Sequence, residues 1–386
     1  MRFARRLDAV PPYLFAELER KLTAKQREGV DVISLGIGDP DLPTPEPVVE
    51  ALIAAARDAA THQYPTNHGS QELREAAAAF YRDRFDVELD PVAEVVPALG
   101  GKEAVGHVAL ALLDPDDVAL APDPGYPPYT SGPLFAGAEL HYLPLTEENA
   151  FLPDLDAIPA PLVERANVLY LNYPNNPTGA VVPAGFFELV VSFAREHEIL
   201  VVHDNAYSET TYDGYVAPSF LATPGAKVVG VEVFSLSKGF NMTGWRCAAI
   251  LGNAEAIQTY WRLKTNVDSG LFEAVQMAGI AALRGPTGPL ERMNETYARR
   301  RDLVVAALRE IGVEVAPPKG TIYVWAPVPE GHTSTSFCEK VLEEAAVVVS
   351  PGSMYGPSGE GFFRIALTAP DERIEEAVER MREHLA

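Results

Sequence analysis

Short apolar runs rich in β-branched residues alternate along the middle of the chain with longer stretches of helical spacing. The runs are apolar at consecutive positions, as are strands that helices cover on both faces of a parallel sheet. Stretches such as Lys102–Leu113 and Phe186–Glu198 have the length that right-handed crossovers require. The seven predicted strands are Glu94–Leu99, Val118–Ala121, Glu139–Leu143, Asn167–Leu171, Ile199–His203, Val228–Phe234 and Cys247–Leu251. We therefore predict an α/β fold with a large, mostly parallel, seven-stranded sheet covered by helices.

The two ends of the chain have a different pattern. Residues 1–47 are rich in proline and are predicted to be irregular, whereas residues 320–386 alternate short strands with helices. The predicted elements there are a strand at Thr321–Ala326, a helix at Ser334–Ala345, strands at Val347–Ser350 and Phe362–Leu367, and a helix from Pro370. A long helical pattern over Pro289–Ile311 connects them to the sheet. We expect a large domain over residues 48–288 and a smaller α+β domain built from residues 1–47 and 289–386.

Composition and charge narrow the class of partner. The chain has 386 residues, of which 47% are hydrophobic, as in an ordinary folded globular protein. Its 31 basic and 54 acidic residues give a net charge of −23. This charge argues against a nucleic-acid partner, because proteins that bind nucleic acids carry a basic surface that displaces counterions.

The cysteines and the N-terminus bear on the compartment. Cys247 and Cys338 form no CxxC or Cys/His pattern, which argues against a disulfide scaffold and against a metal site and suits a reducing compartment. The basic start of the chain meets Asp8 and the Pro11-Pro12 pair before any long apolar run, so neither a signal peptide nor a membrane helix is visible. We expect a soluble, cytoplasmic protein with no membrane partner.

The most informative string is Phe234-Ser235-Leu236-Ser237-Lys238, which continues to Arg246. Lys238 follows a buried strand, and partial desolvation of an ammonium lowers its pKa and makes the amine a usable nucleophile for a Schiff base. Two hydroxyls before the lysine and an arginine eight positions after it are the groups that a phosphate site uses. A surface lysine in a loop is the ordinary alternative.

Other polar strings also follow predicted strands. Asp204 and Tyr207 come after Val201-Val202-His203, where open α/β sheets bind ligands, although an aspartate there is also a common helix N-cap. By themselves, the residues around Asn176 and the string Gly100-Gly101-Lys102 predict only turns. A helix that begins after paired glycines can also bind an anion at its N-terminus. Near the C-terminus, alternation along the strand places Arg364 beside Ala366, where its guanidinium could bind a carboxylate or simply be solvated.

Together these strings resemble the class I and II aminotransferases, which are pyridoxal 5′-phosphate enzymes of the aspartate aminotransferase fold, also called PLP fold type I. The resemblance spans about Gly36 to Arg364 and implies that Lys238 carries the cofactor as a Schiff base and moves the substrate proton. It also implies that Asp204 holds the ring nitrogen and that Tyr207 and Asn176 contact the phenolic oxygen.

The resemblance assigns the remaining contacts as well. Tyr126 stacks on the cofactor ring, and the α-carboxylate of the substrate lies at Gly38, Asn176 and Arg364. Tyr64 reaches the phosphate of the neighbouring subunit, which implies a homodimer with shared active sites. The implied phosphate-binding residues of the same subunit are Gly100, Gly101, Lys102, Ser235, Ser237 and Arg246.

The implied reaction is amino transfer between an amino acid and a 2-oxo acid. The strings GIGDPDLPTPEP, YPTNHGSQELR and SKGFNMTGWR look most like those of LL-diaminopimelate aminotransferases, which act with 2-oxoglutarate in lysine biosynthesis. Aspartate or alanine aminotransferases of broader specificity and a β-eliminating C–S lyase on the same fold remain alternatives. An aminotransferase-like half of a transcription regulator would need a DNA-binding domain, which we do not expect, since only 35 residues precede Gly36.

Overall fold

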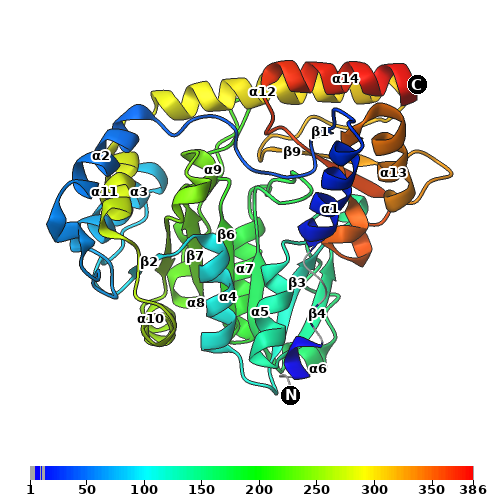
Figure 1. The fold of residues 1–386 in the computed structure, drawn as a ribbon. Helices are drawn as coiled ribbons and strands as arrows, with labels where there is room; N and C mark the ends of the chain where they lie inside the picture. The colour runs from blue at the N-terminus through cyan, green and yellow to red at the C-terminus, as the bar shows by residue number, and fades with distance from the viewer. Residues whose placement is uncertain (1–4, 9, 11–13, 386) are drawn as a thin grey trace.

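A large helix-flanked sheet and a smaller unit make up the molecule in Figure 1, with the long helix α12 (Gly288–Glu310) running along one side of both. The structure is a computed structural model that describes residues 5–8, 10 and 14–385. No helix among these residues has the length and hydropathy that crossing a membrane requires.

The large sheet has seven strands in the order β2-β8-β7-β6-β5-β3-β4. Only β8 runs antiparallel to its neighbours, and the other paired strands are parallel, which confirms the predicted mostly parallel α/β sheet. The observed strands are β2 (Val95–Ala98), β3 (Val118–Asp123), β4 (Glu139–Pro144), β5 (Ala166–Leu171), β6 (Leu200–Asn205), β7 (Gly230–Ser235) and β8 (Ala248–Gly252).

Helices cover both faces of this sheet because its central strands are apolar on both sides. One apolar cluster joins the sheet to α4 (Gly101–Leu112) and α10 (Ala254–Val267), with α5 (Pro128–Ala136) packed on α4. Another joins it to α7 (Phe186–Glu196) and α8 (Ala226–Val229). The short helices α6 (Ala160–Val163) and α9 (Leu236–Gly239) lie in connections, and α2 (Glu46–Ala56), α3 (Gln71–Phe85) and α11 (Glu273–Arg284) pack together beside β2.

The smaller unit is built on an antiparallel sheet of β11 (Ser350–Pro351), β12 (Phe362–Ala366) and β9 (Tyr323–Pro327). The helix α13 is observed over Ser334–Ala345, as predicted, and α14 (Asp371–Leu385) packs along α12. The N-terminal segment joins this unit, because β1 (Ile33–Ser34) pairs in parallel with β10 (Val347–Val348). A separate apolar cluster fills this unit, and on that ground we propose the division into residues 48–288 and residues 1–47 with 289–386.

One prediction about the N-terminal segment is wrong. Within residues 1–47, which were expected to be irregular, α1 spans Leu14–Arg27. This stretch contains no glycine or proline and is rich in leucine, alanine, glutamate and lysine, which favour helix. Two ion pairs attach it to α13, Lys21 with Glu339 at 2.9 Å and Lys25 with Glu343 at 2.5 Å.

Candidate active site

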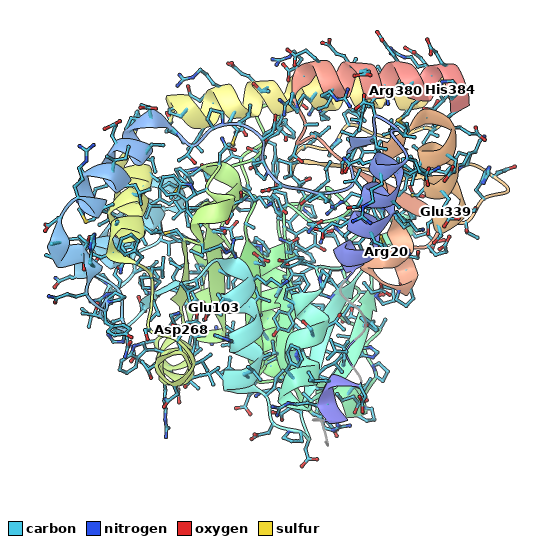
Figure 2. All side chains as sticks on the ribbon, viewed as in Figure 1. Arg20, Glu103, Asp268, Glu339, Arg380 and His384 are labelled. Carbon is cyan, nitrogen blue, oxygen red and sulfur yellow. The ribbon has the colours of Figure 1, made fainter. Side chains whose placement is uncertain are left out.

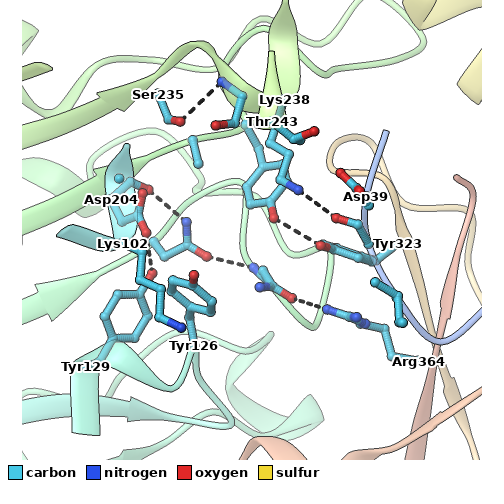
Figure 3. A pocket seen from close by; sticks show the side chains of 18 of the residues that line it. Asp39, Lys102, Tyr126, Tyr129, Asp204, Ser235, Lys238, Thr243, Tyr323 and Arg364 are labelled. Carbon is cyan, nitrogen blue, oxygen red and sulfur yellow. Dashed lines mark hydrogen bonds between the residues drawn. The ribbon is translucent and has the colours of Figure 1, made fainter. Parts of the chain in front are cut away.

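A cavity of about 320 Å³ lies where the carboxyl ends of the large sheet's parallel strands face the smaller unit. Asp204 on β6 and Ser235 on β7 line the cavity from the large sheet. Tyr323 on β9 and Arg364 on β12 line it from the smaller unit (Figure 3). Polar groups from segments far apart in sequence therefore converge at the edge of an α/β sheet that commonly binds ligands.

Lys238 lies on the short helix α9, directly after β7. Its Nζ donates a hydrogen bond of 2.6 Å to the carbonyl oxygen of Gly38. Figure 3 shows the Lys238 side chain in the cavity. Burial lowers the pKa of Lys238, because less water solvates the ammonium; Tyr323 and Asp39 act in the opposite direction, and the positive charges of Arg364 and Arg246 lower the pKa further. The amine is therefore placed and tuned to act as a nucleophile and as a base.

Asp204 lies at the base of the cavity with 5% of its surface exposed. Its Oδ2 accepts a hydrogen bond of 2.9 Å from the hydroxyl of Tyr129, whereas its Oδ1 is buried with no hydrogen-bond partner among the described residues. Burial raises the pKa of Asp204 to about 6, against the hydrogen bond from Tyr129 and the charges of His203 and Lys238. A buried carboxylate oxygen without a partner is costly unless a cationic donor binds there.

This carboxylate gives a prediction for the protein without cofactor. An acid whose pKa rises on folding stabilises the fold fully below its unfolded pKa, and that stability is lost as pH rises through the folded value near 6. The Asp204→Asn variant carries no such charge, so at pH 8 it should unfold with a free energy about 3 kcal/mol above wild type. Chemical denaturation at pH 8 and pH 5 measures this difference, which should shrink at pH 5; a constant difference would contradict the assignment.

A candidate anion site lies at the N-terminus of α4. Gly100 has a φ of +86°, and a Cβ at this position would lie 2.2 Å from Nη2 of Arg246, so only glycine lets the turn approach the arginine. Gly100, the N-cap of α4, makes no side-chain capping hydrogen bond to the first turn, and the positive end of the helix dipole there favours an anion. Ser235, Ser237 and Lys102 line the cavity beside this turn.

A polar network outside the cavity supports this turn. Glu103 of α4 accepts a hydrogen bond of 2.9 Å from the backbone N–H of Leu99 and further bonds from the hydroxyl of Tyr260. Glu103 and Asp268 approach each other in Figure 2, and Lys264, which is 1% exposed, has its amine 2.7 Å from Asp268. Two carboxylates and one imidazole, those of Glu103, Asp268 and His107, lie close enough together to ligate a metal. The ammonium of Lys264, however, already pairs with both carboxylates.

Arg364 is 1% exposed, so the structure excludes a solvated strand arginine. Its Nη1 donates a hydrogen bond of 2.9 Å to Oδ1 of Asn176, and its Nη2 donates one of 2.9 Å to the carbonyl oxygen of Gly36. An amide that accepts through its oxygen donates through its nitrogen, so Asn176 can serve the cavity as a donor. The guanidinium is held at the side of the cavity opposite Asp204, as Figure 3 shows.

The structure brings most of the predicted site residues together, while Gly100 and Tyr64 are outside the lining. Gly100 adjoins the lining through Gly101, and Tyr64 is 90% exposed on the surface. The predicted residues that line the cavity are Gly38, Gly101, Lys102, Tyr126, Asn176, Asp204, Tyr207, Ser235, Ser237, Lys238, Arg246 and Arg364.

Sequence reasoning missed several lining residues that make polar contacts with the predicted ones. Tyr129 binds the carboxylate of Asp204, and the Asn172 amide donates to its backbone carbonyl at 2.7 Å. Tyr323 lies under Arg364 and has its hydroxyl 3.2 Å from that of Tyr207. Alternation along the predicted strand Thr321–Ala326 could have placed Tyr323 on the same face as Trp325, but only the strand pairing brings it to Arg364.

Comparisons with known proteins agree with this geometry. The family described as "Aminotransferase class I and II" matches residues 30–381. An LL-diaminopimelate aminotransferase of Moorella thermoacetica is 53% identical over 382 residues, covering 99% of this chain and 98% of that protein. A second one, from Desulforudis audaxviator, is 53% identical over 379 residues, covering 98% and 97%.

Solved structures give the same result. The substrate-bound BacF structure from Bacillus subtilis has a TM-score of 0.96 and 40% identity, covering 99% of this chain and 98% of that one. A mutant aspartate aminotransferase of Thermus thermophilus has a TM-score of 0.92 and 30% identity, covering 99% and 100%. The match to the family over nearly the whole length, on a fold whose cavity contains the half-buried Lys238, shows that this chain belongs to the class I and II aminotransferases.

Proposed function

We propose that this protein binds pyridoxal 5′-phosphate and transfers an amino group from LL-diaminopimelate to 2-oxoglutarate. The observation that carries the proposal is the half-buried Lys238 amine in one cavity with the guanidinium of Arg364 and with Oδ1 of Asp204, which has no hydrogen-bond partner among the described residues. The substrate is inferred from the names of relatives about 50% identical over nearly the full chain. A role in lysine biosynthesis follows from that substrate.

The cavity fits the cofactor at both ends. The unpartnered Oδ1 of Asp204 is suited to a protonated ring nitrogen, since a charged hydrogen bond would offset its burial. The N-terminus of α4, with Arg246 against Gly100, is suited to a phosphate. The phosphate would be bound by Gly100, Gly101, Lys102, Ser235, Ser237 and Arg246, and the ring by Tyr126, Asn176, Asp204 and Tyr207.

Each residue then has a defined task. Arg364 and the backbone at Gly38 bind the α-carboxylate of the amino acid and orient its Cα–H bond toward Lys238. The Nζ of Lys238 would take the proton from Cα as a base and, once protonated, would donate it again as an acid. When bound, the cofactor supplies an electron sink for the pair left at Cα, and Asp204 keeps its ring nitrogen protonated.

The substrate assignment is tested by comparing amino donors. We expect kcat/KM for LL-diaminopimelate, with 2-oxoglutarate as acceptor, to exceed the values for aspartate and alanine. A higher value for aspartate or alanine would replace the substrate but leave the reaction class in place. Pyruvate and ammonia formed from a cysteine thioether such as cystathionine, with its thiol as the leaving group and no amino acceptor present, would identify a β-eliminating C–S lyase.

Arg364→Lys tests the carboxylate site, because lysine keeps the charge but loses the two-point geometry of the guanidinium. Two charge-assisted hydrogen bonds are then weakened, and affinity for both amino acids and 2-oxo acids should fall on the order of a hundredfold. Cofactor content, measured by absorbance after gel filtration, should stay at the wild-type level. Unchanged affinity for both substrate types would show that the carboxylate binds elsewhere.

We also infer a homodimer with shared active sites. Tyr64 is 90% exposed, and the end of α10 and the N-cap and first half of α11 expose further apolar side chains, namely Val267, Phe272 and Met277 at 54%, 44% and 42%. The rings of His62 and Phe272 lie 6.3 Å apart, so the Tyr64 loop and the start of α11 form one surface. An apolar surface of this kind favours association with a second copy.

The dimer prediction is tested by sedimentation. Wild-type protein should sediment at about twice the chain mass of 41.8 kDa. Phe272→Asp buries a charge in the interface and should raise the dimer dissociation constant about tenfold or more. Leu189→Asp, at a residue of α7 that is 67% exposed, serves as the matched control and should leave the dimer intact. A fully active wild-type monomer would contradict the shared site.

The cytoplasmic location stays a prediction. Both cysteines are buried and free, which is typical of proteins in a reducing compartment.

A further inference from the structure

The guanidinium of Arg364 lies between two tyrosine rings. Its Cζ is 3.9 Å from the ring centroid of Tyr323 and 4.8 Å from that of Tyr355. A guanidinium over an aromatic face gains both electrostatic attraction and stacking, most strongly where water is excluded. Hydrogen bonds to Asn176 and Gly36 fix the positions of its two terminal nitrogens. The two rings then fix the remaining freedom, which is the tilt of the guanidinium plane.

Strand pairing places Tyr323 under the arginine. In the antiparallel pair of β9 and β12, Tyr323 lies opposite Ala366 and Trp325 lies opposite Arg364. Tyr323 and Arg364 are therefore diagonal neighbours on one face of the sheet, within reach for long side chains. Tyr323 lies on a paired strand rather than in a loop, and it is only 3% exposed. Residues on such rigid elements position a binding group precisely.

The hydroxyl of Tyr323 faces the other half of the site. The hydroxyl of Tyr207 lies 3.2 Å from it and donates a hydrogen bond to it. A Cβ at Gly38 would lie 2.1 Å from the Tyr323 oxygen, so glycine is needed beside the hydroxyl, and Gly38 also accepts the bond from Lys238. Burial raises the pKa of Tyr323, but the charges of Arg364 and Lys238, together with hydrogen bonding to Tyr207 and Arg364, hold it below its usual value.

We propose that Tyr323 is a positioning residue with two separable tasks: its ring seats the Arg364 guanidinium for the α-carboxylate, and its hydroxyl orients that of Tyr207. This inference rests on the proposed function, in which Arg364 binds the carboxylate and Tyr207 donates to the phenolic oxygen of the cofactor. Because a phenol has one O–H, the bond between the two tyrosines then reverses, and the Tyr323 hydroxyl donates to the oxygen of Tyr207. One aromatic side chain thereby couples the substrate-carboxylate site to the cofactor site.

The ring is tested by binding of glutarate, a dicarboxylate with no amino or oxo group, to the cofactor-loaded protein by titration calorimetry. Tyr323→Phe keeps the ring and should bind glutarate within about twofold of wild type, whereas Tyr323→Leu should bind it about tenfold or more weakly. Tyr355→Leu removes the more distant ring and should cause a smaller loss. It also keeps the test decisive if Tyr323→Leu does not fold, since wild-type affinity in Tyr355→Leu would overturn the role of the rings.

The hydroxyl is tested by the pH titration of the bound cofactor's absorption band. Tyr323→Phe should raise the midpoint by about half a pH unit, because Tyr207 loses the partner that orients its donation to the phenolic oxygen. A role in packing alone would not move this midpoint, and a midpoint equal to that of wild type would overturn the role of the hydroxyl.

Arg364→Ala separates failure of this inference from failure of the proposed function. If Arg364→Ala binds glutarate as wild type does, Arg364 does not bind the carboxylate, and the proposed function fails at this residue. Positioning of Arg364 by the Tyr323 ring would then have no effect on substrate binding. If Arg364→Ala loses glutarate while Tyr323→Leu and Tyr355→Leu keep it, only the present inference is overturned. We expect the affinity for glutarate to fall in Arg364→Ala and in Tyr323→Leu but to stay near the wild-type value in Tyr323→Phe.

Discussion

Lys238→Ala is expected to lower kcat on the order of 10⁴-fold, because one amine both binds the cofactor covalently and moves the proton. Its Nζ is held 2.6 Å from the carbonyl of Gly38 in the cavity that contains Asp204 and Arg364. The matched control is Lys340→Ala, since the amine of Lys340 lies 3.9 Å from Glu344 on the surface and such a pair contributes little. Steady-state rates with LL-diaminopimelate and 2-oxoglutarate measure both variants.

Covalent labelling checks the same residue independently. Borohydride reduction of the wild-type holoenzyme should attach the cofactor permanently to Lys238, as peptide mapping would detect. A label on Lys264 or Lys227, or an Lys238→Ala variant with a tenth or more of the wild-type rate, would contradict the assignment.

Asp204→Asn is expected to lower kcat by about 10²–10³-fold, which is the usual cost of losing a charge-stabilising group in a site closed to water. A neutral amide cannot hold the ring nitrogen protonated, whereas the phosphate contacts made by Ser235, Ser237 and Arg246 remain. The variant should therefore retain its cofactor, which absorbance after gel filtration measures. A nearly normal turnover would show that the carboxylate has no such role.

Asp302→Asn provides the matched control for this change. Asp302 pairs with Arg301 at 2.7 Å, and its side chain is 63% exposed, so it lies outside the cavity. Its neutralisation should leave kcat within about twofold, as is usual for surface substitutions.

Much of the fold could be predicted from the sequence because its strands are buried on both faces. Such strands are continuous apolar runs, and all seven strands of the large sheet were located, with every end within two residues of its predicted position. The helix at Leu14–Arg27 was missed because the nearby Pro11-Pro12 pair suggested an irregular segment. Proline restricts only its own turn, so the helix formers that follow it decide the structure.

The candidate site was predictable where its residues lie in short strings after strands. Lys238, Asp204 and Asn176 are of this kind, because chain order places each at the carboxyl end of a parallel strand. Tyr323 and Tyr129 could not be identified in this way, since each acts on a residue from a distant part of the chain. Strand register and side-chain direction, which only the folded structure supplies, create those contacts.

Transfer of ¹⁵N from labelled LL-diaminopimelate to 2-oxoglutarate tests the central claim most directly. Incubation of the cofactor-loaded protein with both compounds, followed by mass spectrometry, should show the label in glutamate, in stoichiometric amount with the 2-oxo acid formed from the donor. Little ¹⁵N should be found as free ammonia. Label released as ammonia, or glutamate labelled only when aspartate or alanine is the donor, would contradict an LL-diaminopimelate aminotransferase.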